Sequence, residues 1–240
     1  MKHRILAILL LAACLLTLLP ATAMAVPETE TRSKGGKLIA LTFDDGPGPY
    51  TRRLLEGLAK RGVKATFFML GQQAENYDVT AGLVRDAGHQ IASHTYDHPQ
   101  LSKKTDSQVR WQISHTADIL NRITGYGTHY LVRPPYGDYD KALIETVDSL
   151  GMSTIQWSVD SLDWKESATP DSIFKRVTGK VTNGSIVLFH NDADHTPEAL
   201  PGILKCLKEQ GYEFVFISDL ILKDNYTIDH TGKQCPAAAE

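Results

Sequence analysis

Residues 38–47 read LIALTFDDGP, an apolar run that ends in two adjacent carboxylates and a Gly-Pro pair. The run has the length and composition of a buried β-strand. Side chains of adjacent strand residues point to opposite sides, so Asp44 and Asp45 can serve one site only if the chain turns there, as Gly46-Pro47 suggests. One carboxylate could then bind a metal ion while the other handles a proton. Alone, however, Asp-Asp-Gly is more typical of a solvated turn.

Strand-like and helix-like segments alternate along the rest of the chain. The strand-like segments are 38–43, 65–70, 89–92, 130–133, 153–157, 186–189 and 213–217. The helix-like segments are 52–60, 79–87, 109–123, 141–150, 171–177 and 198–210. This alternation predicts an α/β fold with a mainly parallel sheet. Seven strands favour a distorted (β/α) barrel, although a flavodoxin-like sheet also fits the pattern.

The first 25 residues have the pattern of an export signal. Lys2 and Arg4 precede an apolar run at 5–19, and Ala23-Met24-Ala25 carries the small residues that a signal peptidase reads. The run also approaches the length of a membrane anchor. Lipoprotein processing at Cys14 is a further alternative.

The remainder of the chain is long enough for one sizeable core and too short to suggest two ordinary domains. We therefore expect a signal peptide at 1–25, retained only if it acts as an anchor, a linker at 26–36, one catalytic domain at 37–222 and a C-terminal tail at 223–240.

Charge and cysteine content limit the partners and the covalent links of the protein. The net charge is −3 with no long run of one sign, so nothing favours a nucleic-acid partner. No protein partner is predicted, and membrane contact is expected only if the N-terminal segment is retained. After removal of the signal, Cys206 and Cys235 remain, and they could form a disulfide or stay as two thiols.

Residues 93–98 read SHTYDH and follow a predicted strand. His94 and His98 are four residues apart, a spacing that brings two imidazoles together on one side of a helical turn. With Asp45 as a third ligand, the set leaves positions open for water and substrate, as a catalytic metal requires. Asp97, between the histidines, is more typical of a solvated loop residue.

Three further polar clusters follow predicted strands. RPPYG at 133–137 begins with an arginine whose fixed charge can hold a carboxylate ionised and oriented. DSLDW at 160–164 and IVLFH at 186–190 supply an aspartate and a histidine, the pair that a general acid needs. Leu188 and Trp164 could form an apolar wall. Each cluster also has a structural interpretation, such as a surface arginine, a core leucine, a buried tryptophan anchor or a strand-end histidine.

In this order, TFDDGP, SHTYDH, RPPYG, DSLDW and LFH resemble the five motifs of the polysaccharide deacetylase family, also called the NodB-homology domain or carbohydrate esterase family 4. The resemblance spans about residues 38–222. It implies a distorted (β/α) barrel and a metal-dependent hydrolase that removes acetyl groups from the N-acetyl sugars of a polysaccharide. The products would be acetate and a glucosamine-type residue.

The resemblance also implies roles for individual residues. Asp45, His94 and His98 would bind one divalent ion, with zinc expected and cobalt or another divalent ion as alternatives. Asp44 would be the general base that takes a proton from the attacking water, whose acidity the ion raises. Arg133 would orient Asp44.

The remaining motif residues would act on the leaving group and the substrate. His190 would be the general acid, oriented by Asp163, and the backbone N–H of Tyr136 would stabilise the oxyanion. The expected substrate-pocket residues are Pro135, Trp164 and Leu188.

The polymer itself is not encoded in these motifs. Because the signal resembles a short bacterial one, peptidoglycan N-acetylglucosamine is the expected substrate and the bacterial surface or exterior the expected location. Chitin oligomers, N-acetylmuramic acid and acetylated xylan are alternatives. A carbohydrate-binding wall protein without activity is a further alternative, although such a protein would not need both Asp44 and His190. The chain lacks the His-Glu-x-x-His motif of zinc peptidases.

Overall fold

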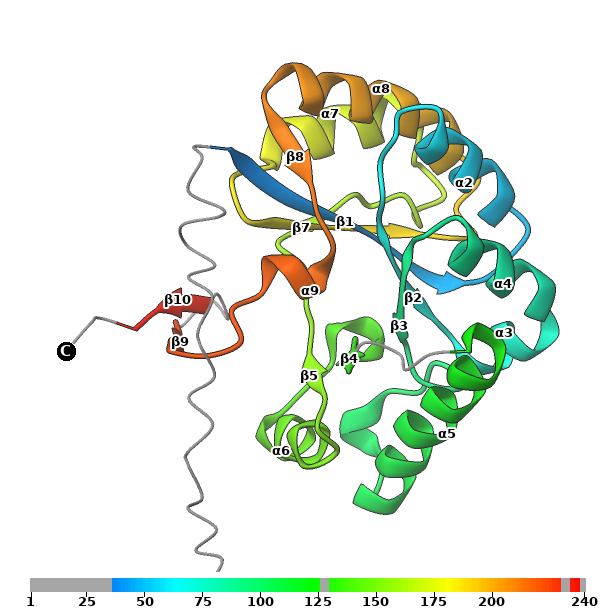
Figure 1. Ribbon diagram of the computed structural model, residues 1–240, viewed down its shortest axis with the longest axis vertical. Helices are drawn as coiled ribbons and strands as arrows, with labels where there is room; N and C mark the ends of the chain where they lie inside the picture. The colour runs from blue at the N-terminus through cyan, green and yellow to red at the C-terminus, as the bar shows by residue number, and fades with distance from the viewer. Residues whose placement is uncertain (1–35, 126–129, 230–233, 238–240) are drawn as a thin grey trace, which may run out of the picture. The chain divides into compact units, whose positions relative to one another are not determined.

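The computed structural model describes residues 36–125, 130–229 and 234–237 (Figure 1). Its main sheet has the order β5-β4-β3-β2-β1-β7-β6, and β8 pairs with β1 outside this path. All of these pairs are parallel. The strands are β1 Lys37–Gly46, β2 Thr66–Met69, β3 Gln90–Ser93, β4 Leu131–Val132, β5 Ser153–Thr154, β6 Val159–Asp160, β7 Ser185–His190 and β8 Tyr212–Phe214.

Helices connect the strands and lie outside the curled sheet (Figure 1). They are α2 Thr51–Ala59, α3 Gly71–Asn76, α4 Asp78–Asp86, α5 Asp106–Thr124, α6 Lys141–Ser149, α7 Pro170–Lys180 and α8 Thr196–Glu209. The short helix α9 Ile217–Leu220 follows β8, and its Ile217 packs with Ala40 and Phe68. Two 3-10 turns, η1 Leu101–Lys103 and η2 Pro135–Gly137, and the hairpin of β9 Tyr226–Ile228 with β10 Gln234–Pro236 complete the described elements. The expected α/β fold with a parallel sheet is therefore confirmed. The strand path ends at β5 and β6 without pairing them, so the barrel is a partly open one.

Alternation along β1 separates the core from the site. Ile39, Leu41 and Phe43 are fully buried in the hydrophobic cluster between the sheet and its helices. Ala40 belongs to a second cluster on the opposite face of the strand. Because strand side chains alternate with a period of two, Asp44 lies on the same inner face as Ala40.

Local sequence explains where α5 and α7 begin. Thr105 and Gln108 form a capping box at the start of α5, and Gly125 ends this helix in the left-handed conformation. Thr169 caps α7 in the same way, with Pro170 at the first helical position. These caps satisfy backbone groups that a helix end leaves without partners.

Several short elements were not predicted. α3, β6, α9 and the two strands of the β9–β10 hairpin are each six residues long or shorter, too short to show a clear periodicity. The predicted strand at 213–217 was too long, because Ile217 begins α9. The segment predicted as a tail contains the β9–β10 hairpin. The Gln234 side chain accepts the N–H of Leu222 and donates to the carbonyl oxygen of the same residue.

The structure describes part of the predicted C-terminal tail but not the predicted signal. The signal predicted at 1–25 and residues 26–35 of the linker predicted at 26–36 lie outside the described residues. Within the described residues, no helix is long and apolar enough to span a bilayer. Cys206 and Cys235 are not joined to each other: the Cys206 sulfur accepts from Gln210, and the Cys235 thiol lies 3.9 Å from an Asp229 oxygen.

The buried aromatic stack of β1, β2 and β7 should carry much of the stability. Phe43 lies between Phe67 and Phe189, with ring centroids 5.0 Å and 5.4 Å away. We expect Phe43→Ala to lower the free energy of unfolding by about 3–5 kcal/mol, because it removes buried surface and leaves a cavity. Urea denaturation measures this change. Val79→Ala, at a side chain 68% exposed, is the matched control and should change stability by less than about 0.5 kcal/mol. A loss similar to that of the control would contradict the packing described here.

Candidate active site

A bulge at the end of β1 brings both aspartates to one site. Pairing with β2 shifts between Phe43 and Gly46, where three steps along β1 face two steps along β2. Asp45 has a φ of 67°, in the left-handed region that residues with a side chain rarely adopt. A Cβ at Gly46 would lie 2.4 Å from the Asn191 side chain, so only glycine fits there. The predicted turn is confirmed, and it lets adjacent carboxylates point toward the same place.

Asp45, His94 and His98 form a cluster that suits a divalent cation. Their ligand atoms all lie within 4.8 Å of one another. The Asp45 Oδ1 atom is 3.4 Å from Nε2 of each histidine, and it is buried without a hydrogen-bond partner among the described residues. Two donors that are each about 2.0–2.1 Å from a tetrahedral zinc ion lie roughly 3.3–3.4 Å apart. The three residues therefore fit such an ion.

His94 is held in the form that a ligand requires. Its Nδ1 atom donates to the carbonyl oxygen of Arg133 at 2.7 Å, which leaves Nε2 directed toward Asp45. Burial lowers the pKa of His94 to about 3, although the charge of Asp45 opposes this shift. The imidazole is therefore neutral, as metal binding requires.

The two histidines do not lie on a helical turn, so that part of the sequence prediction was wrong. They lie in the loop after β3, where Thr95 has a φ of 72° and His98 a φ of 60°. These left-handed residues, rather than helical periodicity, bring the two imidazole rings together, with their centroids 5.0 Å apart.

A glutamine of α5 supports this loop. The Gln112 side chain is buried; its oxygen accepts the N–H of Tyr96 at 2.8 Å, and its nitrogen donates to the Asp97 carboxylate at 2.6 Å. Asp97 thus binds Gln112. Gln112 was not predicted as part of the site, because no sequence pattern pairs a helix residue with this loop.

Arg133 and Asp44 form a buried ion pair beside the cluster. Arg133 Nη1 donates to Asp44 Oδ1 and to Thr42 Oγ1, both at 2.7 Å. The arginine is 0% exposed and lies 4.1 Å from the ring centroid of Phe68, which excludes a surface arginine. Burial raises the pKa of Asp44, and the positive charge of Arg133 opposes this shift. Asp44 can therefore accept a proton more readily than an exposed carboxylate.

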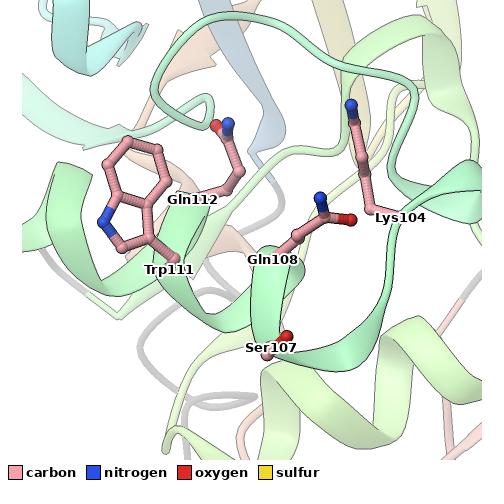
Figure 2. A pocket seen from close by; sticks show the side chains of 5 residues that line it. All are labelled: Lys104, Ser107, Gln108, Trp111 and Gln112. Carbon is pink, nitrogen blue, oxygen red and sulfur yellow. The ribbon is translucent and has the colours of Figure 1, made fainter.

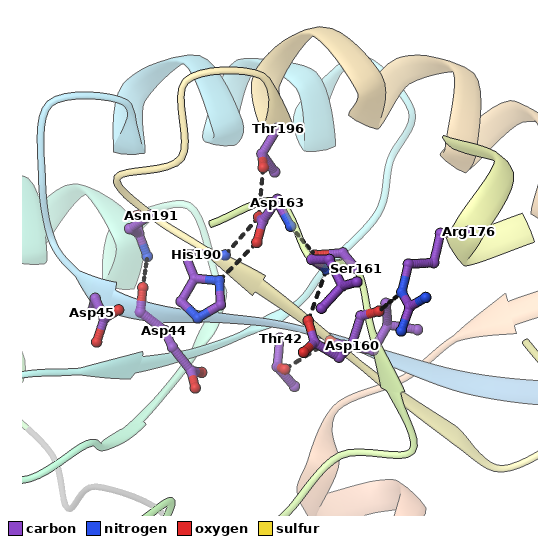
Figure 3. Close-up of polar contacts among 12 residues, drawn as sticks. Thr42, Asp44, Asp45, Asp160, Ser161, Asp163, Arg176, His190, Asn191 and Thr196 are labelled. Atoms are coloured by element: carbon purple, nitrogen blue, oxygen red, sulfur yellow. Dashed lines mark hydrogen bonds and ion pairs between the residues drawn. The ribbon is translucent and has the colours of Figure 1, made fainter. Parts of the chain in front are cut away.

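His190 and Asp163 form a second pair (Figure 3). The His190 ring donates from Nδ1 to Asp163 Oδ1 at 2.7 Å, and the His190 N–H donates to the other carboxylate oxygen. Thr196, which the sequence analysis missed, also donates to this oxygen, at 2.6 Å. Burial alone would lower the pKa of His190, but the hydrogen bond and charge of Asp163, with the charges of Asp44 and Asp45, raise it to about 9. A ring that stays protonated at neutral pH can act as an acid.

The expected substrate-contacting residues occupy different surroundings. Pro135 is buried at the start of η2, and Tyr136 has a φ of 61° with its ring 4.5 Å from that of His98. Within the described residues, no acceptor binds the backbone N–H of Tyr136. Leu188 is buried, whereas Trp164 is 57% exposed, which excludes a buried anchor.

A hollow of about 230 Å³ opens beside the cluster of Asp45, His94 and His98. Asp45 and His98 form part of its wall, together with Gln73, Tyr77 and Asp192. Neither Trp164 nor Leu188 lines it. Gln73 and Tyr77 were not predicted as site residues, because they lie in and directly after α3, a helix too short to be predicted from the sequence.

Comparison with known proteins agrees with this geometry. The family model for polysaccharide deacetylase matches residues 31–155. A peptidoglycan-N-acetylglucosamine deacetylase of Bacillus cereus is 37% identical over 187 residues, which cover 76% of this chain and 67% of that protein. Peptidoglycan-N-acetylglucosamine deacetylase PgdA of Listeria monocytogenes is 41% identical over 203 residues, covering 83% of this chain. The aligned part is only 42% of the Listeria protein, so the chain matches less than half of that relative.

The fold is also shared with solved structures. A crystal structure of a peptidoglycan N-acetylglucosamine deacetylase matches with a TM-score of 0.74 and 36% identity, covering 77% of this chain and 88% of that one. The chain therefore belongs to the polysaccharide deacetylase family, as the order of its five motifs predicted.

Proposed function

We propose that the protein is a metal-dependent deacetylase of bacterial cell-wall polysaccharide that hydrolyses the acetamide of N-acetylglucosamine residues and releases acetate. The observation that carries this proposal is the register of two strands. Asp44 on β1 and His190 on β7 are direct partners, beside the Asp45, His94 and His98 cluster. A base and an acid thus flank one cation site, as amide hydrolysis requires.

Asp45, His94 and His98 are the residues that would hold the ion. Two imidazoles and a carboxylate suit zinc, and cobalt or another divalent ion could substitute. A bound ion would polarise the acetamide carbonyl and increase the acidity of a water molecule.

The chain's own residues then move the protons. Asp44, oriented by Arg133, takes a proton from the attacking water. The backbone N–H of Tyr136 donates to the oxygen that gains negative charge as water adds to the carbonyl carbon. His190, oriented by Asp163, gives its proton to the sugar nitrogen as the carbon–nitrogen bond breaks.

Three further residues are proposed to contact the substrate. Leu188 and Trp164 would contact the acetyl methyl group. Pro135 would contact the substrate at the oxyanion-binding turn, whose movement its ring also limits. Peptidoglycan is the proposed polymer, because it is named for both the Bacillus and the Listeria relative. With the export signal predicted at 1–25, the enzyme would act at the cell surface or outside the cell.

The proposed reaction is tested by acetate release from the purified chain. Peptidoglycan, N-acetylglucosamine oligomers and acetylated xylan would each be incubated with added zinc or cobalt, and again with a chelator. We expect release from peptidoglycan that stops when the metal is removed. Release from no polymer despite bound metal would contradict the function, and release from xylan alone would contradict the polymer.

Asp44→Asn should separate metal binding from turnover. We expect the variant to keep its metal and to lose roughly 100-fold or more of its turnover, because the amide cannot act as a base. His94→Ala is the matched contrast and should lose the metal itself. Metal content by mass spectrometry and acetate release measure both effects. Wild-type activity in Asp44→Asn would remove this residue as the base, and full metal occupancy in His94→Ala would show that the cluster is not the metal site.

Asp163→Asn should change the pH dependence of turnover. Asp163 stabilises the protonated His190 ring, so its loss should lower the pKa of His190. Because the acid must be protonated, activity falls as pH rises through this pKa, and the alkaline limb should therefore move to lower pH. Asp160, at the end of β6, accepts the Leu162 N–H with its carboxylate and has no other side-chain hydrogen bond among the described residues. Asp160→Asn is therefore the control and should leave the limb in place. An alkaline limb that stays at the wild-type pH in Asp163→Asn would exclude this role.

A further inference from the structure

A second hollow lies at the start of α5, apart from the motif residues. It has a volume of about 280 Å³ and is lined by Lys104, Ser107, Gln108, Trp111 and Gln112 (Figure 2). Small-ligand sites begin at roughly 300 Å³, so the space suits one small ring rather than a long segment. None of the proposed catalytic or metal-binding residues lines it.

Trp111 offers a rigid aromatic surface at this hollow. Its side chain is 49% exposed. Covering a large indole with a ligand removes apolar surface from water, which favours binding. The ring stacks on His115 at a centroid distance of 4.7 Å and meets the Tyr96 ring edge-on at 5.2 Å. These contacts hold the indole in place, so binding a ligand to it would cost little side-chain entropy.

The rim of the hollow supplies hydrogen-bond donors. The Gln108 side-chain oxygen accepts the N–H of Thr105 at 3.0 Å, which leaves the side-chain NH₂ as a donor. Within the described part of the chain, neither this nitrogen nor Lys104 Nζ has a partner. A ligand for this place therefore has an apolar face for Trp111 and oxygen acceptors at its edge. A pyranose ring has both, because its C–H bonds form apolar patches and its hydroxyl and acetamide oxygens project outward.

The hollow shares a wall with the loop that carries the histidines. Gln112 lines it, and both polar atoms of this side chain bind the loop between His94 and His98, at Tyr96 and Asp97. A polymer whose acetamide lies at the cation site could thus extend along this loop to Trp111.

We infer that this hollow is a separate saccharide subsite, which binds a sugar unit of the polymer other than the one that loses its acetyl group. The sugar ring covers Trp111, and its oxygens accept from Gln108 and Lys104. The positive charge of Lys104 favours a sugar that bears a carboxylate. This inference rests on the proposed function for the identity of the polymer.

The test measures binding and turnover separately. Metal-loaded Asp44→Asn is titrated calorimetrically with N-acetylglucosamine oligomers of increasing length, with and without Trp111→Ala. We expect affinity to increase with length until the subsite is filled, and Trp111→Ala to raise Kd for long oligomers about tenfold, with a smaller effect on short ones. Tyr130→Ala is the matched control: this tyrosine is 66% exposed and precedes β4, at the end of the strand opposite the site. It should leave Kd unchanged at every length.

Turnover and charge give independent readouts. With Asp44 intact, Trp111→Ala should raise KM for the polymer more than it lowers kcat, as expected for lost binding away from the reacting atoms. Lys104→Gln should weaken the binding of oligomers with carboxylate-bearing sugars more than the binding of plain N-acetylglucosamine oligomers. Metal stoichiometry and circular dichroism establish that each variant is folded.

The outcomes distinguish the two proposals. Length-dependent affinity that Trp111→Ala leaves intact would overturn the subsite, even if the chain releases acetate. Loss of oligomer affinity in Trp111→Ala without acetate release from any polymer would support the subsite and contradict the deacetylase function. Equal effects of Trp111→Ala and Tyr130→Ala would also overturn the subsite, because they would show a nonspecific response to loss of an exposed ring.

Discussion

The buried guanidinium of Arg133 is the constraint on which the rest of the site depends. Its side chain binds Asp44, while its carbonyl oxygen accepts from His94. One residue therefore positions the proposed base through its side chain and a proposed metal ligand through its backbone. A buried charge lowers stability unless a group of opposite charge lies beside it. Removal of either Arg133 or Asp44 would therefore leave the other as an unpaired buried charge. Thr42 and the face of Phe68 complete the surroundings that make this burial tolerable.

The loops that carry the site contain backbone conformations that residues with side chains usually avoid. Seven non-glycine residues of the described chain have a positive φ, and five of them lie in the motifs: Asp45, Thr95, His98, Tyr136 and Leu162. Each such conformation costs roughly 1–3 kcal/mol and persists only where contacts with the surrounding structure stabilise it. Here the parallel sheet and its aromatic core provide that support. In return, adjacent residues such as Asp44 and Asp45 reach one site.

Different surroundings prepare two neighbouring groups for opposite proton transfers. Asp44 and His190 are register partners on β1 and β7. Asp44 is paired with a fixed positive charge, which favours its ionised form despite burial, whereas His190 is paired with the Asp163 carboxylate, which favours its protonated form. Enzymes commonly separate an acid from a base in this way, through environment rather than residue type. The proposed cation site lies beside both groups, so one acetamide could reach all three.

The class of fold and the chemistry at the strand ends could be predicted from the sequence, because apolar periodicity and short motifs are local properties. The motifs placed Asp44, Asp45, Arg133, Asp163 and His190 in polar clusters after strands, and the structure brings them to one edge of the sheet. Tertiary contacts were needed to show that His94 and His98 meet through a loop with left-handed residues, supported by Gln112, and that Arg133 is fully buried. The same holds for the Trp111 hollow. These features depend on contacts between segments far apart in the chain, and such contacts leave no period or spacing in the sequence.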